Sequence, residues 1–252
     1  MNLRGKVALI TGGRRIGRLL ALSLAERGAS VALTYLTSRD VIEETVRQIE
    51  TLGVRAIAIT ADLSQSGDAE RAVAETMMDF GRLDILVNMA SIFRRTPFPA
   101  LVPSDFDAMI GSNLASAYHT SIAAARRMKE SGSEEGVRGK IVFVGDWASD
   151  RPYKDYLPYL VAKGALKTLT LALAKELAPQ ITVNLVQPAM IDPPPDMTAG
   201  QIGAVVDQTP LKRVGTPEDL NRLILYLLEG TDFATGSCYR VDGGRFLGTD
   251  ER

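Results

Sequence analysis

The sequence contains a single cysteine, Cys238, and a single histidine, His119. One cysteine cannot form an internal disulfide or a cysteine cluster for a metal, and one histidine gives a His-based zinc site or a Ser-His-Asp triad little to work with. We therefore expect a site without metal. A chain that needs no disulfide suits a reducing compartment, which makes the cytoplasm the expected location.

The chain also lacks a strong net charge and a long apolar run. Its formal net charge is −1 and its pI is near 6.0, so no broad basic field attracts nucleic acid or anionic lipid. No apolar run approaches the roughly 20 residues that span a bilayer, and the first residues lead straight into an expected strand at Val7. We therefore expect no nucleic-acid or membrane partner and favour a small-molecule substrate.

Short apolar runs rich in β-branched residues alternate with amphipathic segments. The expected strands are Val7–Ile10, Ser30–Tyr35, Ala56–Thr60, Ile85–Asn88, Lys140–Val144, Thr182–Gln187 and Cys238–Val241. The expected helices are Ile16–Arg27, Arg39–Leu52, Asp68–Phe80, Asn113–Lys129, Tyr159–Leu177 and Pro217–Leu228. Continuous apolar strands separated by helices indicate a parallel sheet covered on both faces, the α/β doubly wound Rossmann architecture. With 252 residues, of which 46% are hydrophobic, we expect one domain over residues 1–252.

The stretch from Pro188 to Val214 is irregular and carries Asp192-Pro193-Pro194-Pro195-Asp196. It follows an expected strand, and sheets of this kind bind ligands beyond the carboxyl ends of their strands. We interpret residues 188–215 as a mobile loop that covers a substrate. A plain connector is the alternative.

Residues 7–18 form a pattern of strand, glycine turn and helix start. The turn contains Gly12, Arg14, Arg15, Ile16 and Gly17. Such a turn brings backbone N–H groups and the positive end of a helix to a pyrophosphate. The pattern predicts a dinucleotide site.

The end of the second expected strand reads Tyr35-Leu36-Thr37-Ser38-Arg39, with no carboxylate before Asp40. An acidic residue at this corner binds an adenosine ribose, whereas cationic and hydroxyl groups suit a 2′-phosphate. With Arg14 and Arg15 nearby in the expected fold, we predict NADP (NADPH) in preference to NAD. The alternative is that Ser38 caps the next helix and Arg39 is solvated; both interpretations can hold together.

Tyr159 and Lys163 stand four residues apart at the start of an expected helix. At this spacing the two side chains share a helix face, so the ammonium favours ionisation of the phenol. A phenol placed in this way can pass a proton while a nicotinamide passes a hydride. An isolated pair of this kind is common on protein surfaces, but this pair follows the fifth expected strand of a dinucleotide-binding pattern.

From residue 6 to Gly244 the chain resembles the short-chain dehydrogenase/reductase family. The resemblance rests on the glycine turn, Tyr159 with Lys163, and four further stations: Asp62-Leu63, Asn88-Met89-Ala90-Ser91, Asn113 and Asp242-Gly243-Gly244. The turn departs from the family pattern Thr-Gly-x-x-x-Gly-x-Gly. Arg15 takes the place of the middle glycine, and the loop is one residue shorter.

The resemblance implies roles for the first three of these stations. Asp62 and Leu63 would contact the adenine, and the segment with Asn88 and Ala90 would pass next to the ribose. Asn113 would hold a chain of water molecules that returns a proton to the Tyr159 phenol. Without the family, Asp62 reads as a helix cap. The implied cofactor site comprises Gly12, Arg14, Arg15, Ile16, Gly17, Tyr35, Thr37, Ser38, Asp62, Leu63, Asn88, Ala90, Ser91, Tyr159, Lys163, Pro188 and Met190. The resemblance also implies a homotetramer, with interfaces made by the long helices after Asn113 and Tyr159.

Asp146 stands where the family normally has a serine that polarises a carbonyl. A hydroxyl donates to a ketone oxygen and to the developing alkoxide, whereas an ionised carboxylate repels that charge. A C=N bond in a nitrogen heterocycle makes a different demand, because the neighbouring N–H groups need an acceptor and the ring nitrogen needs a proton. An aspartate with a raised pKa serves both needs.

This arrangement is similar to the pteridine reductase branch of the family. That branch carries an Asp in the serine place, a Ser-x-Phe after the fourth strand, an Arg in the glycine turn and a Tyr-x-x-x-Lys. Asp146, Ser91-Ile92-Phe93, Arg15 and Tyr159 with Lys163 fill those places in order.

The resemblance implies a set of substrate contacts. Phe93 would stack on a pterin that has the nicotinamide on its other face, and Ser91 would bond the cofactor phosphate or the pterin amino edge. Trp147 would wall the pocket and help to desolvate Asp146. Ordinary loop packing for Phe93 and a core position for Trp147 are the alternatives. Arg94 and Arg95 are near enough to meet a glutamyl tail, but we prefer to read them as solvated.

These observations predict an NADPH-dependent reductase that transfers hydride to a C=N bond of a pteridine, a dihydropterin or dihydrofolate. The predicted catalytic residues are Asp146, Tyr159, Lys163 and Asn113, and the predicted substrate contacts are Ser91, Phe93, Asp146, Trp147 and Tyr159. Two alternatives remain open. One is a carbonyl reductase of the same family that acts on a 3-oxoacyl thioester, a sugar or a small ketone; the other is a non-catalytic NADP-binding sensor.

Overall fold

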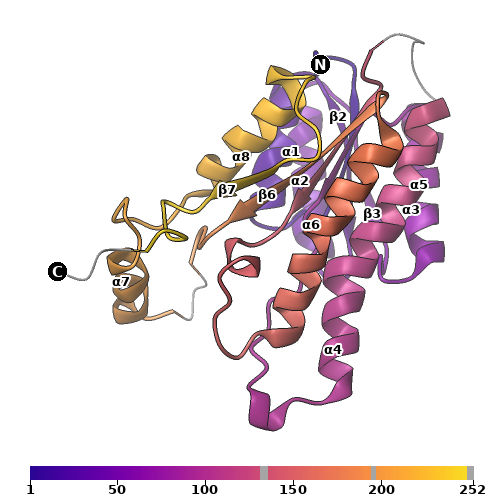
Figure 1. Ribbon diagram of the computed structural model, residues 1–252. Helices are drawn as coiled ribbons and strands as arrows, with labels where there is room; N and C mark the ends of the chain where they lie inside the picture. The colour runs from indigo at the N-terminus through magenta and orange to yellow at the C-terminus, as the bar shows by residue number, and fades with distance from the viewer. Residues whose placement is uncertain (131–135, 194–196, 249–252) are drawn as a thin grey trace.

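The computed structural model describes residues 1–130, 136–193 and 197–248 (Figure 1). Within these ranges seven strands form one parallel sheet in the order β3-β2-β1-β4-β5-β6-β7. They are β1 (Val7–Thr11), β2 (Ser30–Tyr35), β3 (Ala56–Thr60), β4 (Ile85–Asn88), β5 (Gly139–Val144), β6 (Ile181–Pro188) and β7 (Cys238–Val241). The order reverses between β1 and β4, the point at which such sheets bind nucleotides. The predicted single-domain Rossmann fold is confirmed.

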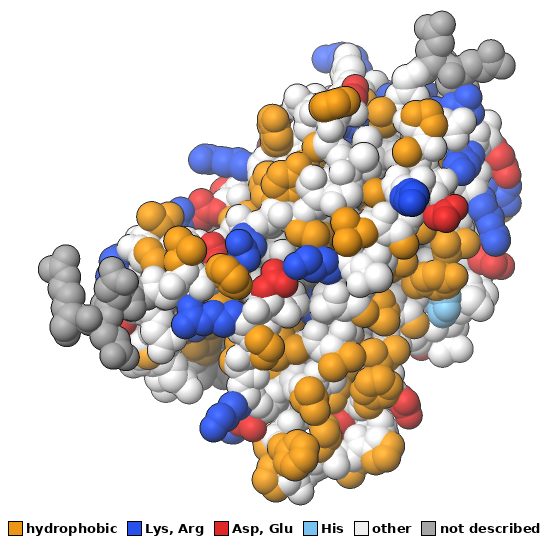
Figure 2. Space-filling model, viewed as in Figure 1, with side chains coloured by type: hydrophobic (Ala, Val, Ile, Leu, Met, Phe, Trp, Pro, Cys, Tyr) orange, Lys and Arg blue, Asp and Glu red, His pale blue; other side chains and the backbone are white. Residues whose placement is uncertain are grey.

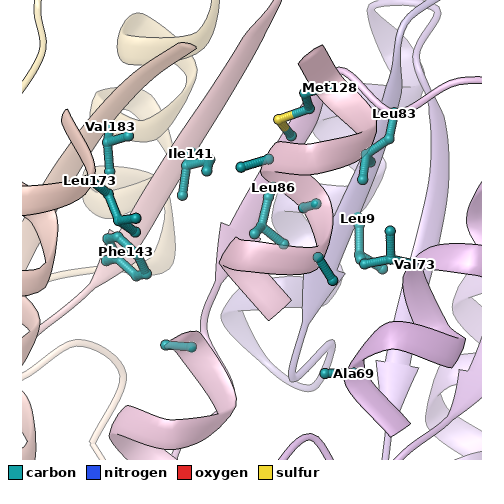
Figure 3. Close-up of a cluster of buried hydrophobic side chains, with 14 of the residues drawn as sticks. Leu9, Ala69, Val73, Leu83, Leu86, Met128, Ile141, Phe143, Leu173 and Val183 are labelled. Carbon is teal, nitrogen blue, oxygen red and sulfur yellow. The ribbon is translucent and has the colours of Figure 1, made fainter. Parts of the chain in front are cut away.

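Helices cover both faces of the sheet (Figure 1). One layer contains α1 (Ile16–Glu26), α2 (Arg39–Thr51) and α8 (Pro217–Leu225), and the other contains α3 (Ser66–Phe80), α5 (Ser116–Glu130) and α6 (Leu157–Leu177). Strand β1 shows why both layers form. Ala8 and Ile10 pack in the first core, beneath α1, α2 and α8, while Leu9 packs in the second core, beneath α3, α5 and α6. Figure 3 shows the second core, where Leu9, Leu86 and Phe143 face the helices. A strand buried on both sides has no polar face, as its sequence indicated.

The helical segment around Asn113 differs from the prediction. It begins earlier, with α4 (Pro103–Ile110), and a π-helical turn at Gly111–Ala115 joins α4 to α5. The prediction that Asn113 starts a helix is therefore wrong, because Asn113 lies inside the π turn. Single π turns are frequent at functional sites.

The segment at 188–215 also differs from an irregular loop. It contains α7 (Ala199–Asp207), which begins with a capping box in which Thr198 Oγ1 accepts a hydrogen bond from Gln201 N. The prolines before Thr198 obscured this start signal in the sequence. Residues 194–196, within the proline run, lie outside the described residues. Figure 1 shows α7 apart from the two helical layers, beside the chain that follows β7.

One helix among the described residues, α6, is long and apolar enough by length and composition to cross a membrane. From the sequence we expected no stretch of about 20 apolar residues, because Lys163 and Lys167 interrupt the apolar run of α6. Half of the apolar window is buried inside the protein, and Leu166 and Leu173 belong to the core beneath the helix.

Asp84 joins the amino ends of β1 and β4. Its carboxylate accepts hydrogen bonds from Val7 N at 2.9 Å, from Lys6 Nζ at 3.2 Å and from Arg82 Nε at 2.8 Å, although the residue is only 2% exposed. A buried carboxylate is tolerated only when its charge and lone pairs are satisfied, as they are here.

Replacing Asp84 by alanine should lower the free energy of unfolding by about 3 kcal/mol, because the Val7 N–H and the Arg82 guanidinium lose their acceptor. Urea unfolding followed by circular dichroism measures the loss. The matched control is Asp79→Ala, whose exposed carboxylate pairs with Arg55 and should contribute about 0.5 kcal/mol or less. Equal losses in the two variants would contradict this account.

Candidate active site

The glycine turn lies at the carboxyl end of β1, against the end of β4. Gly12 has φ +72°, and a Cβ there would stand 2.8 Å from Ala90 Cα. A Cβ at Gly17 would stand 2.8 Å from the Gly12 carbonyl oxygen. Thr11 Oγ1 holds this approach by accepting hydrogen bonds from the Met89 and Ala90 backbone N–H groups at 3.0 and 3.1 Å. The result is a cradle lined by backbone at the switch point, which only glycine permits.

The start of α1 fits an anion. Arg15 occupies the N-cap position with φ 48°, no side chain caps the helix, and its first turn holds no acidic residue. The first backbone N–H groups of such a helix can bind an anion, although the Gly17 N–H already donates to the Arg14 carbonyl at 3.0 Å. Ile16 opens the helix and Arg14 is exposed beside it. These groups suit the pyrophosphate of a dinucleotide.

Arg15 also contacts the segment after β6. Its Nη2 lies 2.9 Å and its Nε 3.1 Å from the Asp192 carboxylate, and it donates to the Asp192 backbone carbonyl as well. Asp192, like Arg15, has a positive φ, at 52°. An ion pair therefore links the predicted phosphate turn to the predicted substrate-covering segment.

The corner after β2 presents hydroxyl groups and no carboxylate before Asp40. Thr37 is exposed, and Ser38 stands at the N-cap position of α2 without making a side-chain cap hydrogen bond. The interpretation of Ser38 as a helix cap is therefore not supported. Arg39 is exposed and pairs with Glu43 at 2.7 Å. The hydroxyl groups remain available to a ligand.

Three of the predicted cofactor residues direct their side chains elsewhere. Asp62 accepts hydrogen bonds from the Ser64 N–H at 3.1 Å and the Ser64 hydroxyl at 2.7 Å, so it caps a turn before α3. Leu63 packs in the hydrophobic core. Asn88 donates to Ser121 Oγ of α5 at 3.0 Å. The side chains of Leu63 and Asn88 are therefore not placed to contact a ligand at the carboxyl edge.

Asn113 ties the π turn to the segment after β4. Its Oδ1 accepts from Ser91 Oγ at 2.5 Å, and its Nδ2 donates to the Ile92 and Met109 carbonyls, each at 3.1 Å. The residue is 1% exposed. Asn113 therefore fixes the place of Ser91 and Ile92, and its role in a water chain stays a prediction.

Asp146 follows β5 and directs its carboxylate at Tyr159. The Tyr159 hydroxyl donates to Asp146 Oδ2 at 2.8 Å, and the Tyr153 hydroxyl lies 3.5 Å from the same oxygen. Burial raises the pKa of Asp146, although the Ala148 N–H, which donates to Oδ1, and the Tyr159 hydroxyl oppose that shift. The predicted upward direction of the Asp146 pKa is confirmed.

Lys163 lies one turn beyond Tyr159 on α6. Its Nζ donates to the Val144 carbonyl at 2.8 Å, and burial lowers its pKa to about 8. The expectation that Lys163 lowers the Tyr159 pKa is wrong for this structure. Burial, followed by the charge of Asp146, raises the pKa of Tyr159 well above its ordinary value. Tyr159 is thus held as a neutral donor toward the carboxylate.

Aromatic rings line one side of this group. Phe93 stacks on Tyr156, with ring centroids 4.6 Å apart and planes 11° apart, and meets the edge of Tyr159 at 5.0 Å. Phe93 is 54% exposed, so its packing against Tyr156 leaves much of the side chain uncovered. Trp147 is buried with Met109 and Tyr159. Trp147 thus belongs to a small core that also borders the carboxyl group.

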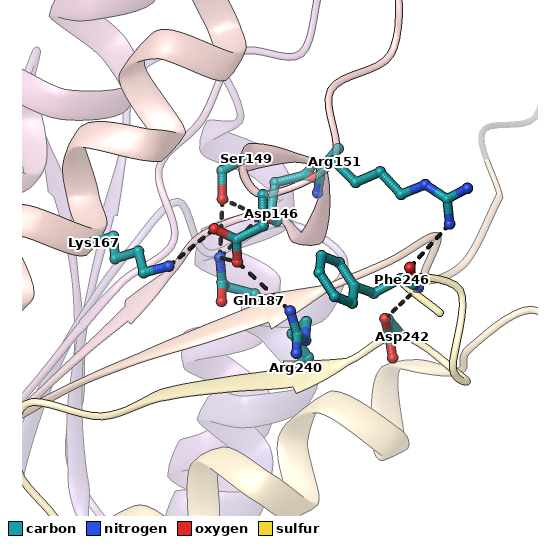
Figure 4. A network of polar contacts seen from close by, with 10 residues as sticks. Asp146, Ser149, Arg151, Lys167, Gln187, Arg240, Asp242 and Phe246 are labelled. Carbon is teal, nitrogen blue, oxygen red and sulfur yellow. Dashed lines mark hydrogen bonds and ion pairs between the residues drawn. The ribbon is translucent and has the colours of Figure 1, made fainter. Parts of the chain in front are cut away.

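A polar network holds the Asp146 backbone from behind (Figure 4). Gln187 on β6 donates to the Asp146 carbonyl at 3.3 Å and to Ser149 Oγ at 2.9 Å, and Ser149 Oγ donates to the Asp146 carbonyl at 2.7 Å. The next carboxylate, Asp150, faces away and pairs with Lys167 at 3.0 Å. Asp146 is the carboxylate of this loop that faces the tyrosines.

Other predicted residues lie at the margins. Arg94 pairs with Asp105 at 2.6 Å and Arg95 with Asp155 at 2.5 Å, so both exposed arginines already have carboxylate partners. Pro188 ends β6, and Met190 lines a cavity beneath residues 189–215.

Tyr153, Tyr156 and Arg245 also belong to this site, and the sequence alone did not point to them. The guanidinium of Arg245 lies 5.1 Å from the centre of the Trp147 ring, and Tyr153 and Tyr156 pack edge to face at 5.1 Å. The two tyrosines follow no helical or strand periodicity in the sequence, because they lie in the loop before α6. Arg245 offered one signal, since it follows the last strand and carboxyl ends of parallel strands meet at one edge.

Together these groups can exchange a proton between a carboxyl and a phenol beside a flat, partly apolar surface. The carboxylate accepts hydrogen bonds when ionised and donates one when protonated, and its raised pKa favours the protonated form more than in an exposed aspartate. The described residues hold no His, Cys, Asp or Glu cluster that suits a metal ion.

The known proteins that this chain resembles are dehydrogenases and reductases. A family model described as Enoyl-(Acyl carrier protein) reductase matches residues 12–245. Cyclohexanol dehydrogenase of Rhodococcus sp. strain TK6 is 37% identical over 267 residues, with 97% of each chain covered. A 3-oxoacyl-[acyl-carrier-protein] reductase of Staphylococcus epidermidis is 30% identical over 247 residues, covering 96% of this chain and 99% of that one. A Burkholderia cenocepacia short chain dehydrogenase solved in complex with NADP is 36% identical, with TM-score 0.89 and coverage of 97% and 99%.

The burial of Lys163 predicts a pH-dependent stability. Below pH 8 the buried ammonium is charged in both states and its desolvation opposes folding. Between a folded pKa of about 8 and the ordinary value of 10.5, the unfolded chain binds more protons, so stability rises with pH. The free energy of unfolding of the protein minus that of Lys163→Met should therefore rise by about 3 kcal/mol across this window. Urea unfolding at a series of pH values measures it, and a flat difference would refute the assignment.

Proposed function

The chain belongs to the short-chain dehydrogenase/reductase family, and we propose that it is an NADPH-dependent reductase of a C=N bond in a pteridine, a dihydropterin or dihydrofolate. The observation that supports this proposal is the 2.8 Å hydrogen bond from the Tyr159 hydroxyl to the Asp146 carboxylate. A carboxyl group occupies the position in which the family pattern places an alcohol, and it faces the tyrosine that the pattern makes the proton donor.

Each residue has a distinct task in this proposal. Asp146 accepts hydrogen bonds from N–H groups on the edge of the heterocycle and, when protonated, delivers a proton toward the ring nitrogen. The Tyr159 hydroxyl, whose raised pKa keeps it neutral, orients that carboxyl through its hydrogen bond, and solvent resupplies the proton. Lys163 holds the ribose next to the nicotinamide, and Asn113 positions Ser91. NADPH, when bound, would supply the hydride for the carbon of the C=N bond.

Three features support the cofactor assignment. The backbone cradle at Gly12 and Gly17 and the uncapped start of α1 suit the pyrophosphate. Thr37, Ser38 and the exposed Arg14 suit a 2′-phosphate. One structural relative was solved with NADP.

A second candidate function is carbonyl reduction, which the relatives favour. Their printed names include cyclohexanol dehydrogenase and 3-oxoacyl-[acyl-carrier-protein] reductase. In that case Asp146 would have to be protonated, so that it donates to the carbonyl oxygen as a serine does. The raised pKa of Asp146 is compatible with this state. The third possibility, a sensor that binds NADP without turnover, leaves the contact between Asp146 and Tyr159 without a task.

A homotetramer in the cytoplasm is also part of the proposal. Exposed apolar side chains on α5 and α6 support it, among them Tyr118, Val161 and Leu171. Figure 2 shows hydrophobic side chains on the face that these helices form. Surfaces of this kind are typical of contacts between subunits.

Replacing Asp146 by serine separates the two enzymatic candidates. A pteridine reductase should lose dihydropterin turnover by about a hundredfold or more, because the acceptor for the ring N–H groups and the acid are both removed. A ketone reductase should keep or gain ketone turnover. Steady-state kinetics with dihydrobiopterin, dihydromonapterin, dihydrofolate and a ketone panel measure this, with NADPH binding as a check on the fold.

Asp150→Asn is the matched control, since this neighbouring carboxylate faces Lys167 and not the tyrosines. It should keep dihydropterin turnover within about twofold. If Asp146→Ser keeps full dihydropterin turnover, the pteridine proposal is wrong.

A carboxylate placed at the corner after β2 should reverse the cofactor preference. Ser38→Asp adds a negative charge where the 2′-phosphate is proposed to bind, so kcat/KM should fall about tenfold or more with NADPH and change little or rise with NADH. Kinetics with both cofactors measure the ratio. An unmodified protein that uses NADH as well as NADPH would count against the assignment, as would an unchanged ratio in the variant.

A further inference from the structure

A cavity of about 280 Å³ lies between residues 189–215 and the segment that follows β7. Its apolar walls include Met190, Val205 and Leu211, and the backbone of Gly243 and Gly244 closes one side. Three arginines also line it, Arg213, Arg240 and Arg245. Figure 2 shows Lys and Arg side chains on the part of the surface near the end of β7.

Two of the three arginines already have carboxylate neighbours. Arg213 makes two hydrogen bonds to the Asp219 carboxylate, at 2.6 and 3.0 Å. Arg240 lies 3.8 Å from Asp150 and stacks on Phe246 with its guanidinium 3.8 Å from the ring centre (Figure 4).

Arg245 has no ion pair among the residues that the structure describes. Its polar contact there is a long one, 3.5 Å to Gln208 Oε1. The carboxylate of Asp242, the other acid in the cavity wall, accepts hydrogen bonds from the Gly244 and Phe246 N–H groups at 3.0 and 2.9 Å. Arg245 is therefore the cation of this cavity whose charge is least compensated.

Arg245 also borders the proposed reaction site. It lies over the Trp147 ring, Trp147 packs against Tyr153 with centroids 6.5 Å apart, and the Tyr153 hydroxyl is 3.5 Å from the Asp146 carboxylate. Burial lowers the pKa of Arg245, which indicates that water solvates its guanidinium incompletely. A ligand that reaches from Asp146 past Trp147 would meet this cation at the mouth of the cavity.

We propose that the cavity receives an anionic group of the substrate, a carboxylate or a phosphate remote from the reduced bond, and that Arg245 binds it. This rests on the proposed function in one respect, that Asp146 marks the reacting end. Arg94 and Arg95, which follow Phe93 in the sequence, are paired with Asp105 and Asp155. A guanidinium without a carboxylate partner forms strong bidentate hydrogen bonds with such anions.

Two substrate pairs test the proposal. Dihydrofolate and dihydrobiopterin share a pterin, and the first adds a carboxylate tail. Acetoacetyl coenzyme A and ethyl acetoacetate share a ketone, and the first adds phosphates. For each pair the readout is the ratio of kcat/KM for the anionic member to that for the neutral member. The matching equilibrium readout is the ratio of dissociation constants for folate and biopterin in the presence of NADP.

Arg245→Gln should lower the anionic-to-neutral ratio by about tenfold or more, and Arg245→Lys, which keeps the charge, should retain most of it. The control Arg94→Gln removes an arginine that is already paired and should leave the ratio unchanged. Urea unfolding of each variant confirms that it is folded. A ratio that is unchanged in Arg245→Gln, or that falls equally in Arg94→Gln, overturns the proposal.

The outcomes keep this inference apart from the proposed function. If only the ketone pair is turned over and its ratio depends on Arg245, the pteridine proposal fails and the anion site stands. If dihydropterins are turned over without such dependence, the anion site fails and the pteridine proposal stands. An unmodified protein that prefers the anionic member of neither pair, in turnover or in binding, overturns the anion site.

Discussion

A largely desolvated carboxyl group between two phenols is the constraint on which the rest of the site depends. The Asp146 carboxylate has Tyr159 at 2.8 Å and Tyr153 at 3.5 Å. Burial favours the protonated acid, while the Tyr159 hydroxyl and the Ala148 N–H favour the carboxylate. The two hydrogen bonds therefore offset part of the shift that burial causes. A group that can both accept and donate suits a heterocycle whose edge offers N–H groups next to a basic nitrogen.

The fold holds this carboxyl group in place with parts that are far apart in the sequence. Strand β5 ends at Val144, two residues before Asp146. From the neighbouring strand β6, Gln187 donates a hydrogen bond to the Asp146 carbonyl. Helix α6 places Tyr159 and Lys163 on one face, and Lys163 is anchored on the last residue of β5 through the Val144 carbonyl. Because residues of both β5 and β6 hold the surroundings of Asp146, the direction of its carboxylate depends on the sheet as well as on the loop.

Most of the fold could be predicted from the sequence because its strands are buried on both faces. Strands Ser30–Tyr35, Ala56–Thr60, Ile85–Asn88 and Cys238–Val241 begin and end where the apolar runs predicted. The π turn at Gly111–Ala115 could not be predicted, since one extra residue in a helical turn leaves no periodic signal. Helix α7 begins with a capping box at Thr198 and Gln201. Because a proline run comes just before this signal, we expected an irregular loop there.

For the site, the sequence identified Asp146, Tyr159 and Lys163, and the structure brings Asp146 and Tyr159 into contact. It could not give the direction of the Tyr159 pKa, because that depends on burial and on the carboxylate 2.8 Å away more than on the helical spacing to Lys163. Nor could it show that Asn88 turns toward Ser121 or that Arg15 pairs with Asp192. Motifs place residues near an edge of the sheet, whereas packing decides which way each side chain points.

The relatives and the site lead to different substrates for a physical reason. Overall sequence identity mainly reflects the shared sheet and helices. A cyclohexanol dehydrogenase and a 3-oxoacyl-[acyl-carrier-protein] reductase have this framework in common with the present chain. Substrate choice depends on a few groups at the carboxyl edge. Here these include the acid Asp146, at the proposed reacting end, and beyond Trp147 the cation Arg245, which makes no ion pair within residues 1–130, 136–193 and 197–248. Under the proposals made above, an acid at one end and a cation at the other would favour a substrate that carries N–H groups at its reacting edge and a negative charge at its far end. A small neutral ketone offers neither feature, whereas a ketone with a phosphate tail offers the negative charge alone, so the acid and the cation make separate contributions to substrate choice.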